Sequence, residues 1–304
     1  VLLVNAHTIA RAVDVGAGKG YLSHCLGVSG LRVTAVDSNS HNTLSSLQRS
    51  REMSKDKSAS FEAITAYISS DDADSFREVI RSCSKFEPEQ DADKRCMLVG
   101  LHACGNLSSN SLRLFAKLQE IRLVCLVGCC YHKLSRGCDD GDSCGGGSEG
   151  GENGFPMSKH LRSSRIRVEE SSLILANYNA GDRVSAGEAD EEADGCYRSS
   201  FFRAAFQLLW RDRLLPFAPE ELRSKNPALG RTASKYPNFL LWVRASMAKL
   251  GVPSSCISDD EILQLHDQLL PQLDLLRRFS ALRSCVSRIL ESILLLDRLC
   301  FLHE

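Results

Sequence analysis

The feature that most constrains the fold is a glycine-rich segment near the start of the chain, VDVGAGKGY at positions 13–21. An apolar run at 12–15 leads into Gly16, Gly18 and Gly20, and an apolar helical pattern follows. Glycine lets the backbone turn sharply and approach a ligand closely, and a helix that begins there supplies unpaired N–H donors and the positive end of its dipole. The segment therefore predicts a buried strand, a ligand-binding loop and a helix.

An acidic residue, Asp37, stands at the end of the next predicted strand, 31–36. A carboxylate in that position can accept hydrogen bonds from both hydroxyls of a ribose. The loop differs from the G-x-G-x-x-G of dinucleotide-binding proteins because its third glycine comes one residue early, and Asp14 precedes the first glycine by two. The pattern is similar to that of S-adenosylmethionine (SAM)-dependent methyltransferases; the alternative is a strand-to-helix turn without a ligand. We expect cofactor contacts from Asp14, Gly16, Ala17, Gly18, Lys19, Gly20, Asp37, Ser38, Leu101 and His102.

Strand-like and helix-like patterns alternate through the first part of the chain. Helices are expected at 21–26, 40–53, 72–82 and 108–118, between strands at 12–15, 31–36, 61–69, 96–101 and 123–127. Strands that alternate with helices form a parallel sheet covered on both faces. The sequence therefore predicts an α/β fold with a doubly wound, mostly parallel sheet.

The rest of the chain differs in composition and in its predicted secondary structure. The segment 137–154 holds eight glycines with little to bury, which predicts a flexible insert, and a loose acidic loop is expected at 181–195. We therefore divide the chain into a SAM-binding methyltransferase core at 1–136, the glycine-rich insert at 137–154 and a helical substrate or partner region at 155–304. Helices of that region are expected at 201–215 and 239–250, from Ser258 onwards, and within 273–302.

Composition excludes several classes of protein. The chain has 304 residues, 43% hydrophobic and 25% charged, which is typical of a globular protein, and its formal net charge of -1 gives no general reason to expect nucleic acid. Thirteen cysteines, an odd number, indicate reduced thiols in the cytoplasm or nucleus rather than a disulfide framework. The most apolar late stretch, 289–302, carries Glu291, Asp297 and Arg298, so we expect no membrane span.

Two unusual strings follow the fourth and fifth predicted strands. They are GLHACG at 100–105 and VGCCYH at 127–132. In a doubly wound sheet, ligands bind outside the carboxyl ends of the strands, so both strings should line the mouth of the site. The expected catalytic residues are His102, Cys129, Cys130, Tyr131 and His132.

These two strings, with FPMS at 155–158, SKY at 234–236 and LDRLC at 296–300, resemble the methyltransferase-like protein 25 family. That family includes a paralogue named as a ribosomal RNA adenine dimethylase domain-containing protein, and related strings occur in tRNA 2′-O-methyltransferases. The resemblance implies a class I methyltransferase of Rossmann-like fold with a helical insertion, SAM as cofactor, and RNA or protein as acceptor. It also implies that related chains continue into further strands, so we expect a fragment that lacks the last strands of the sheet.

The resemblance leaves the acceptor open. N6-adenine dimethylases carry Asn or Asp, prolines and an aromatic residue after the fourth strand, and LHAC at 101–104 supplies none of these. Adenine N6 chemistry is therefore not expected. A base is needed only if the methyl acceptor must lose a proton, and His102 or His132 can serve.

Other interpretations of these residues compete with the catalytic one. A Zn²⁺ ion could be held by His102, Cys104, Cys129, Cys130 and His132, but the spacing lacks paired C-x₂-C motifs, so we expect no metal. Tyr131 could stack on a planar substrate or pack against the insert. The basic run Lys159, His160, Arg162, Arg165 and Arg167 could hold phosphates or be a solvated face. Two further hypotheses are a non-catalytic SAM-binding module that recruits a partner and a structural zinc protein.

Overall fold

The computed structural model describes residues 9, 11–53, 61–82, 95–135, 154–164, 168–178, 191–224, 229, 236 and 238–304. The predicted insert at 137–154 lies outside these residues except for Gly154. The chain divides into two compact units, one formed by Val1–Asn177 with Arg288–Glu304 and the other by Tyr178–Ser287. This division differs from the sequence-based boundaries, since the segment 155–177 and the end of the chain group with the sheet.

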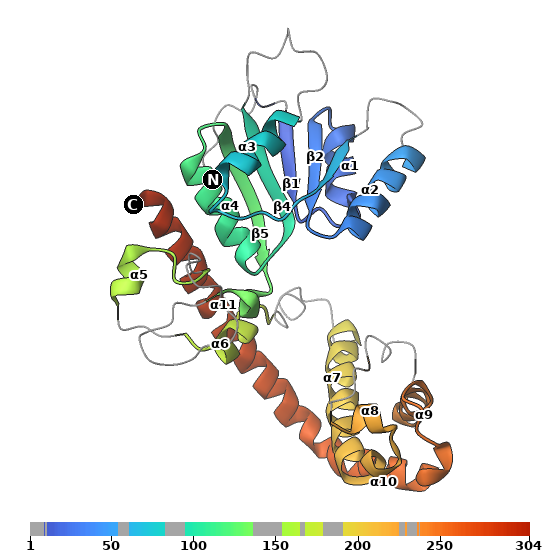
Figure 1. The fold of residues 1–304 in the computed structure, drawn as a ribbon. Coiled ribbons are helices and arrows are strands. Elements are labelled where there is room, and N and C mark those ends of the chain that lie inside the picture. Colours follow the sequence, from blue (N-terminus) through green and yellow to red (C-terminus); the bar gives the residue numbers. More distant parts are fainter. Residues whose placement is uncertain are drawn as a thin grey trace. The chain divides into compact units, whose positions relative to one another are not determined.

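The first unit is built on a five-stranded sheet in the order β3-β2-β1-β4-β5 (Figure 1). Every neighbouring pair is parallel. The strands are β1 Arg11–Val15, β2 Arg32–Asp37, β3 Glu62–Thr65, β4 Cys96–Cys104 and β5 Ile121–Cys129. This architecture confirms the predicted α/β class, a class I methyltransferase Rossmann-like fold.

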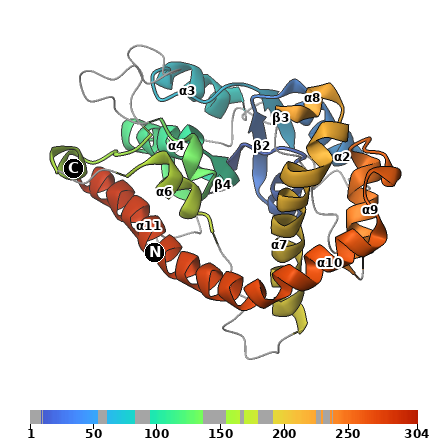
Figure 2. The same cartoon turned by 90° about the horizontal axis from the view of Figure 1, so that it is seen from below.

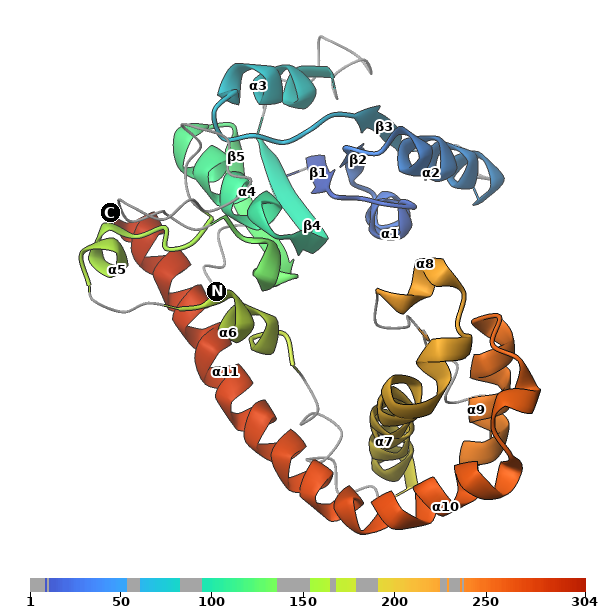
Figure 3. The same cartoon turned by 60° about the horizontal axis from the view of Figure 1, so that its bottom comes forward.

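Helices cover both faces of this sheet. They are α1 Tyr21–Val28, α2 Ser40–Met53, α3 Ala73–Ser82 and α4 Asn106–Lys117. Successive side chains of a strand point to opposite faces, so Val13 of β1 packs with Phe76 of α3 and Leu114 of α4, whereas Ala12 packs with Leu22 of α1. Figure 3 shows α1 and α3 on opposite sides of the sheet. All of β1 is buried, as expected of a central parallel strand.

A smaller apolar cluster in the same unit joins the end of β5 to the end of the chain. It contains Tyr131, Leu134, Phe155, Leu173 and Leu294. The helices that contribute to this part are α5 Lys159–Ser163, α6 Glu170–Leu175 and the last part of α11, which runs over Leu273–His303. The residues after β5 are therefore covered by segments that lie far away in the sequence.

The second unit is helical (Figure 2). It contains α7 Glu191–Leu209, α8 Glu220–Arg223, α9 Phe239–Lys249, α10 Asp259–Leu269 and the part of α11 up to Ser287, with a π-helical turn over Trp210–Leu214 after α7. Phe206, Trp242 and Ile262 are fully buried in its core. A capping box between Ser258 and Glu261 begins α10, which confirms the predicted helix start.

One loop prediction in this unit is wrong. The acidic stretch 181–195 is not a loop throughout, because α7 already begins at Glu191; residues 181–190 lie outside the described part. Glu and Ala are good helix formers, and the helix continues into the apolar face that starts at Phe201. Among the described residues, the helices are either too short or too polar to cross a membrane.

Candidate functional site

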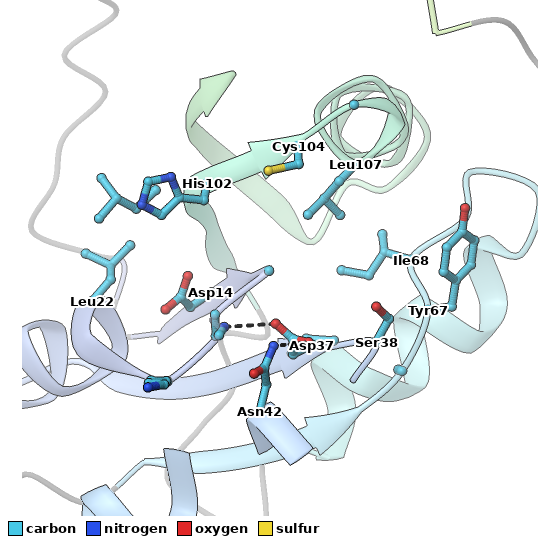
Figure 4. A pocket seen from close by; sticks show the side chains of 18 of the residues that line it. Asp14, Leu22, Asp37, Ser38, Asn42, Tyr67, Ile68, His102, Cys104 and Leu107 are labelled. Atoms are coloured by element: carbon cyan, nitrogen blue, oxygen red, sulfur yellow. Dashed lines mark hydrogen bonds between the residues drawn. The ribbon is translucent and has the colours of Figure 1, made fainter. Parts of the chain in front are cut away.

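A cavity of about 680 Å³ opens at the carboxyl ends of the strands in the first unit (Figure 4). Its walls come from the end of β1, the glycine loop, the end of β2, the segment after β3 and the end of β4. The structure brings together nearly the whole predicted cofactor set here, with the exception of Gly20. The lining includes Asp14, Gly16, Ala17, Gly18, Lys19, Asp37, Ser38, Leu101 and His102.

The glycine loop needs its glycines for two different reasons. Gly16 has a φ of 68°, and a Cβ on it would lie 2.8 Å from the Leu107 side chain, which forms part of the cavity wall. Gly20 has a φ of 74°, and its Cβ would lie 2.7 Å from the Phe61 ring. L-residues rarely adopt such positive φ values. Gly16 therefore keeps the cavity open, whereas Gly20 allows the start of α1 to pack closely against Phe61 and against Ser46 of α2.

The carboxylate of Asp37 is held by three hydrogen bonds at the end of β2. The backbone N–H of Gly18 donates to Oδ2 at 2.9 Å, and Oδ1 accepts from the backbone N–H of Asn39 at 2.9 Å and from Nδ2 of Asn42 at 3.1 Å (Figure 4). A carboxylate offers about four acceptor positions, so Oδ2 retains one for a ligand hydroxyl. These bonds fix the glycine loop to the end of the neighbouring strand.

Asp14 is a second carboxylate in the cavity wall, and it is almost completely buried. It is 1% exposed, and the Ser23 hydroxyl donates to its Oδ2 at 2.6 Å. Burial raises the pKa of Asp14 to about 6, the nearby charge of Asp37 adds to the rise, and the bonds from Ser23 oppose it. A cation bound in this cavity would stabilise the ionised form of Asp14.

A β-bulge brings His102 to the cavity. Gly100 of β4 pairs with Leu126 of β5 and Ala103 pairs with Gly128, so β4 carries one residue more than its partner in this interval. Bulges redirect side chains and are frequent beside active sites. Leu101 is 50% exposed and His102 is also exposed, and Figure 4 shows the imidazole near Leu22 of α1.

The string after β5 does not line the cavity as predicted. Tyr131 is 1% exposed and lies in the cluster with Phe155. Its hydroxyl donates to Glu291 at 3.3 Å, and the guanidinium of Arg298 lies 5.3 Å from the ring centre. Burial raises the pKa of Tyr131. The structure thus selects packing rather than substrate stacking for this side chain.

Its neighbours in the string also lie outside the cavity lining. Cys129 and Cys130 are half-buried, and His132 is exposed in the 3-10 turn Tyr131–Lys133. The backbone of Cys130 is left-handed, with a φ of 50°, which turns the chain directly after the strand. The prediction that His132 faces the cavity is therefore not supported by its position.

Three thiols of the predicted zinc set converge. Sγ of Cys104 and Sγ of Cys129 are 3.0 Å apart, and Sγ of Cys130 lies within 4.8 Å of both. Burial, followed by the neighbouring thiols, raises the pKa of Cys129 to about 12. Neither His102 nor His132 belongs to this group.

The sequence interpretation missed several cavity residues, including Asn42, Tyr67, Ile68 and Lys133. The third strand was expected to run over 61–69, whereas β3 ends at Thr65, so Tyr67 and Ile68 lie beyond the strand. Applying the strand-end rule to a shorter third strand would have found both. Asn42 lies in the first turn of α2, where no sequence signal distinguished it.

The predicted basic run does not reach this cavity either. Lys159, His160 and Arg162 belong to α5 and are absent from the cavity lining, and Arg165 and Arg167 lie outside the described residues. The backbone N–H groups of Lys159 and His160 donate to the Glu304 carboxylate at 2.9 and 3.2 Å. This helix start is therefore tied to the end of α11.

Comparison with known proteins identifies the sheet-bearing segment. Residues 3–137 match the family described as a methyltransferase domain. The chain is 33% identical over 212 residues to probable methyltransferase-like protein 25 of Mus musculus and 32% identical over 209 residues to that of Homo sapiens. Each match covers 69% of this chain but only 33% and 32% of the relatives, so the chain spans about a third of their length. No solved structure matches this chain.

Proposed function

We propose that this chain, which matches a methyltransferase domain over residues 3–137 and is similar to probable methyltransferase-like protein 25, is a SAM-dependent methyltransferase acting on RNA or protein. The observation that carries the choice of cofactor is the buried carboxylate of Asp14 in a cavity that also contains Asp37 and the glycine loop. SAM combines a cationic amino-acid part, which carries a sulfonium and an ammonium group, with a ribose. The carboxylate of Asp14 complements the cationic part, and that of Asp37 complements the ribose.

The cavity offers a partner for each part of this ligand. Asp37 would accept a hydrogen bond from a ribose hydroxyl through Oδ2, and Asp14 would face the cationic amino-acid part. Gly16 and Gly18 would allow the backbone to approach the ligand closely. Ile68, beyond the end of β3, is an apolar wall residue suited to one face of the adenine ring.

When bound, SAM would supply a methyl group that an acceptor attacks in line with the positively charged sulfur, which leaves as a neutral thioether. The chain's own contribution is to align the acceptor and exclude water. His102 is exposed in the bulge of β4 and forms part of the cavity wall, which supports a role in removing a proton from the acceptor. Of the five residues predicted to be catalytic, only His102 lines the cavity, so we assign the catalytic role to His102 and not to Cys129, Cys130, Tyr131 or His132.

Incubation of the chain with tritiated SAM and separate cellular RNA and protein fractions tests the proposal. Label that ribonuclease releases identifies RNA as the acceptor, and label that protease releases identifies protein. The His102→Ala variant should bind SAM and transfer label at least about 100-fold more slowly if it acts as a general base. SAM binding with no label in either fraction would favour the non-catalytic module.

We also propose the cytoplasm or the nucleus as the compartment. Nine cysteines whose side chains the structure describes are free thiols, and three of them lie close together. Such thiols persist in reducing compartments. Immunofluorescence of the tagged full-length protein would test this placement, and a signal confined to the secretory pathway would contradict it.

A further inference from the structure

Three cysteines meet at the ends of β4 and β5, beside the proposed SAM cavity. Cys104 and Cys129 are directly opposite each other in the parallel pairing of the two strands, and Cys130 follows Cys129. The two facing Sγ atoms are 3.0 Å apart, and all three lie within 4.8 Å of one another. The backbone N–H of Gly105 donates to the Cys129 carbonyl at 3.1 Å, which holds the two strand ends together.

This spacing suits a shared metal ion. A Zn–S bond is about 2.3 Å long, so two sulfurs on one tetrahedral zinc lie about 3.8 Å apart. The separations of the three Sγ atoms extend from 3.0 Å to at most 4.8 Å, which brackets that value. Small rotations of the side chains would bring all three sulfurs to bonding distance. Thiolates are soft ligands that select zinc over the hard cations magnesium and calcium.

The backbone is shaped so that the third thiol joins the other two. Cys130 is the one residue other than glycine with a positive φ, 50°, in the described part of the chain. Such a conformation persists only where its surroundings hold it. Asn177, with its amide oxygen turned towards the chain, accepts from the backbone N–H of Cys130 at 2.8 Å and of Tyr131 at 3.2 Å.

The ligand set is incomplete for a structural zinc site. Within the described residues, the group contains three thiols and no histidine or carboxylate. Structural zinc sites are closed by four protein ligands, whereas three protein ligands leave a position for water or substrate. Cys104 is also part of the cavity wall, so the thiol group adjoins the cavity.

We propose that Cys104, Cys129 and Cys130 bind one Zn²⁺ ion as three thiolates, with an exchangeable water molecule as the fourth ligand. Binding releases the three thiol protons to solvent and forms three Zn–S bonds, so the affinity rises with pH. The site concerns metal binding only and does not depend on SAM or on methyl transfer.

Metal substitution tests the proposal on the purified chain. Wild-type protein reduced and freed of metal should take up about one equivalent of Zn²⁺ or Co²⁺. The Co²⁺ form should show sulfur-to-cobalt charge transfer and the visible bands of a four-coordinate ion, and azide should shift these bands. Cys104→Ser and Cys130→Ser should lose this spectrum. Cys125→Ser should keep this spectrum, because Cys125 is an exposed thiol on β5, the strand of Cys129, and lies outside the group of three thiols.

Alkylation of the wild-type protein tests the proposal without relying on a variant that could fail to fold. Zn²⁺ should protect Cys104, Cys129 and Cys130 from iodoacetamide and leave the exposed Cys25 and Cys125 reactive. Equal alkylation with and without Zn²⁺ would overturn the proposal. So would a Cys130→Ser protein with an unchanged Co²⁺ spectrum, or a Cys104–Cys129 disulfide recovered from protein purified with Zn²⁺. A spectrum insensitive to azide would overturn the exchangeable fourth position.

Discussion

The loop after β1 and the turn after β5 were both expected at the site, the loop as part of the cofactor-binding set and the turn as part of the reaction centre. Both follow the carboxyl end of a parallel strand, and both carry unusual sequence. The loop after β1 lines the cavity with Gly16, Ala17, Gly18 and Lys19, whereas the turn after β5 contributes Lys133 and buries Tyr131 against Phe155 and α11. The end of a strand therefore determines the edge of the sheet where a residue lies, but not the direction of its side chain.

Local backbone geometry accounts for the difference. One extra residue in β4 exposes Leu101 and His102 beside the cavity, although the regular alternation of a strand would have turned one of them inward. After β5, the left-handed Cys130 turns the chain so that Tyr131 enters an apolar cluster. Each deviation spans a single residue and decides which side chains a ligand can reach.

Removal of the Tyr131 ring should have the largest effect and should act on stability. We expect Tyr131→Ala to lower the free energy of unfolding by about 3–5 kcal/mol, because it leaves a cavity among Phe155, Leu173 and Leu294. Urea denaturation measures this loss. Tyr131→Phe, which removes only the hydroxyl bonded to Glu291, should cost about 1 kcal/mol. If Tyr131→Ala kept its stability but lost methyl transfer, Tyr131 would instead be a residue of the substrate site.

Removal of the Asp37 carboxylate should act on SAM binding. We expect Asp37→Ala to weaken SAM binding by roughly 10- to 100-fold, since hydrogen bonds to a charged group contribute about 1.5–3 kcal/mol. Calorimetry measures the affinity. Asp74→Ala is the matched control, because its carboxylate is exposed on α3 and lies outside the cavity lining. Equal affinity in wild type and Asp37→Ala would refute the assigned ribose contact.

The pKa of Asp14 makes the affinity for SAM depend on pH. An acid with a pKa of about 6 is about one-tenth ionised at pH 5 and about nine-tenths ionised at pH 7. The ionised form attracts a cationic ligand, so SAM affinity should rise about tenfold over this interval, with proton release on binding at pH 6. Calorimetry in two buffers of different ionisation enthalpy detects that release. Asp14→Asn should abolish the pH dependence.

The same pKa predicts how stability changes with pH in the absence of ligand. The folded pKa of about 6 lies above the ordinary value of 3.8, so the folded protein keeps a proton that the unfolded chain has already released between these values. The contribution of Asp14 to stability is therefore full below about pH 4 and lost as the pH rises through about 6. Urea denaturation across this range should show a smaller fall for Asp14→Asn.

The smallest effect is expected from His132, the histidine of the turn after β5. His132→Ala should change the free energy of unfolding by less than about 0.5 kcal/mol and leave SAM affinity unchanged, because the side chain is exposed and outside the cavity lining. Thermal denaturation and SAM titration measure both quantities. An equal loss of methyl transfer in His132→Ala and His102→Ala would contradict the conclusion that the end of β4 reaches the reaction centre and His132 after β5 does not.

The sequence was sufficient for most of the sheet-bearing unit because strands and helices there have strong local signatures. The helix expected at 40–53 is α2 at Ser40–Met53, and the run at 12–15 lies within β1. Asp37 was predicted correctly as a cavity residue because the sequence alone shows an acidic residue directly after a strand-like run. Tyr67 and Ile68 were missed because their apolar side chains continue the pattern of β3 beyond the point where its pairing ends.

By itself, the amino-acid sequence determined the α/β class, the glycine loop and the carboxylate at the end of β2, since each depends on neighbours within a few residues. The tertiary structure alone decided that Asp14 is buried at the cavity, that Tyr131 packs with α11, and that three thiols from two strand ends converge. These features depend on strand register, on one extra residue in β4 and on contacts between segments 160 or more positions apart. Local periodicity carries no information about such contacts.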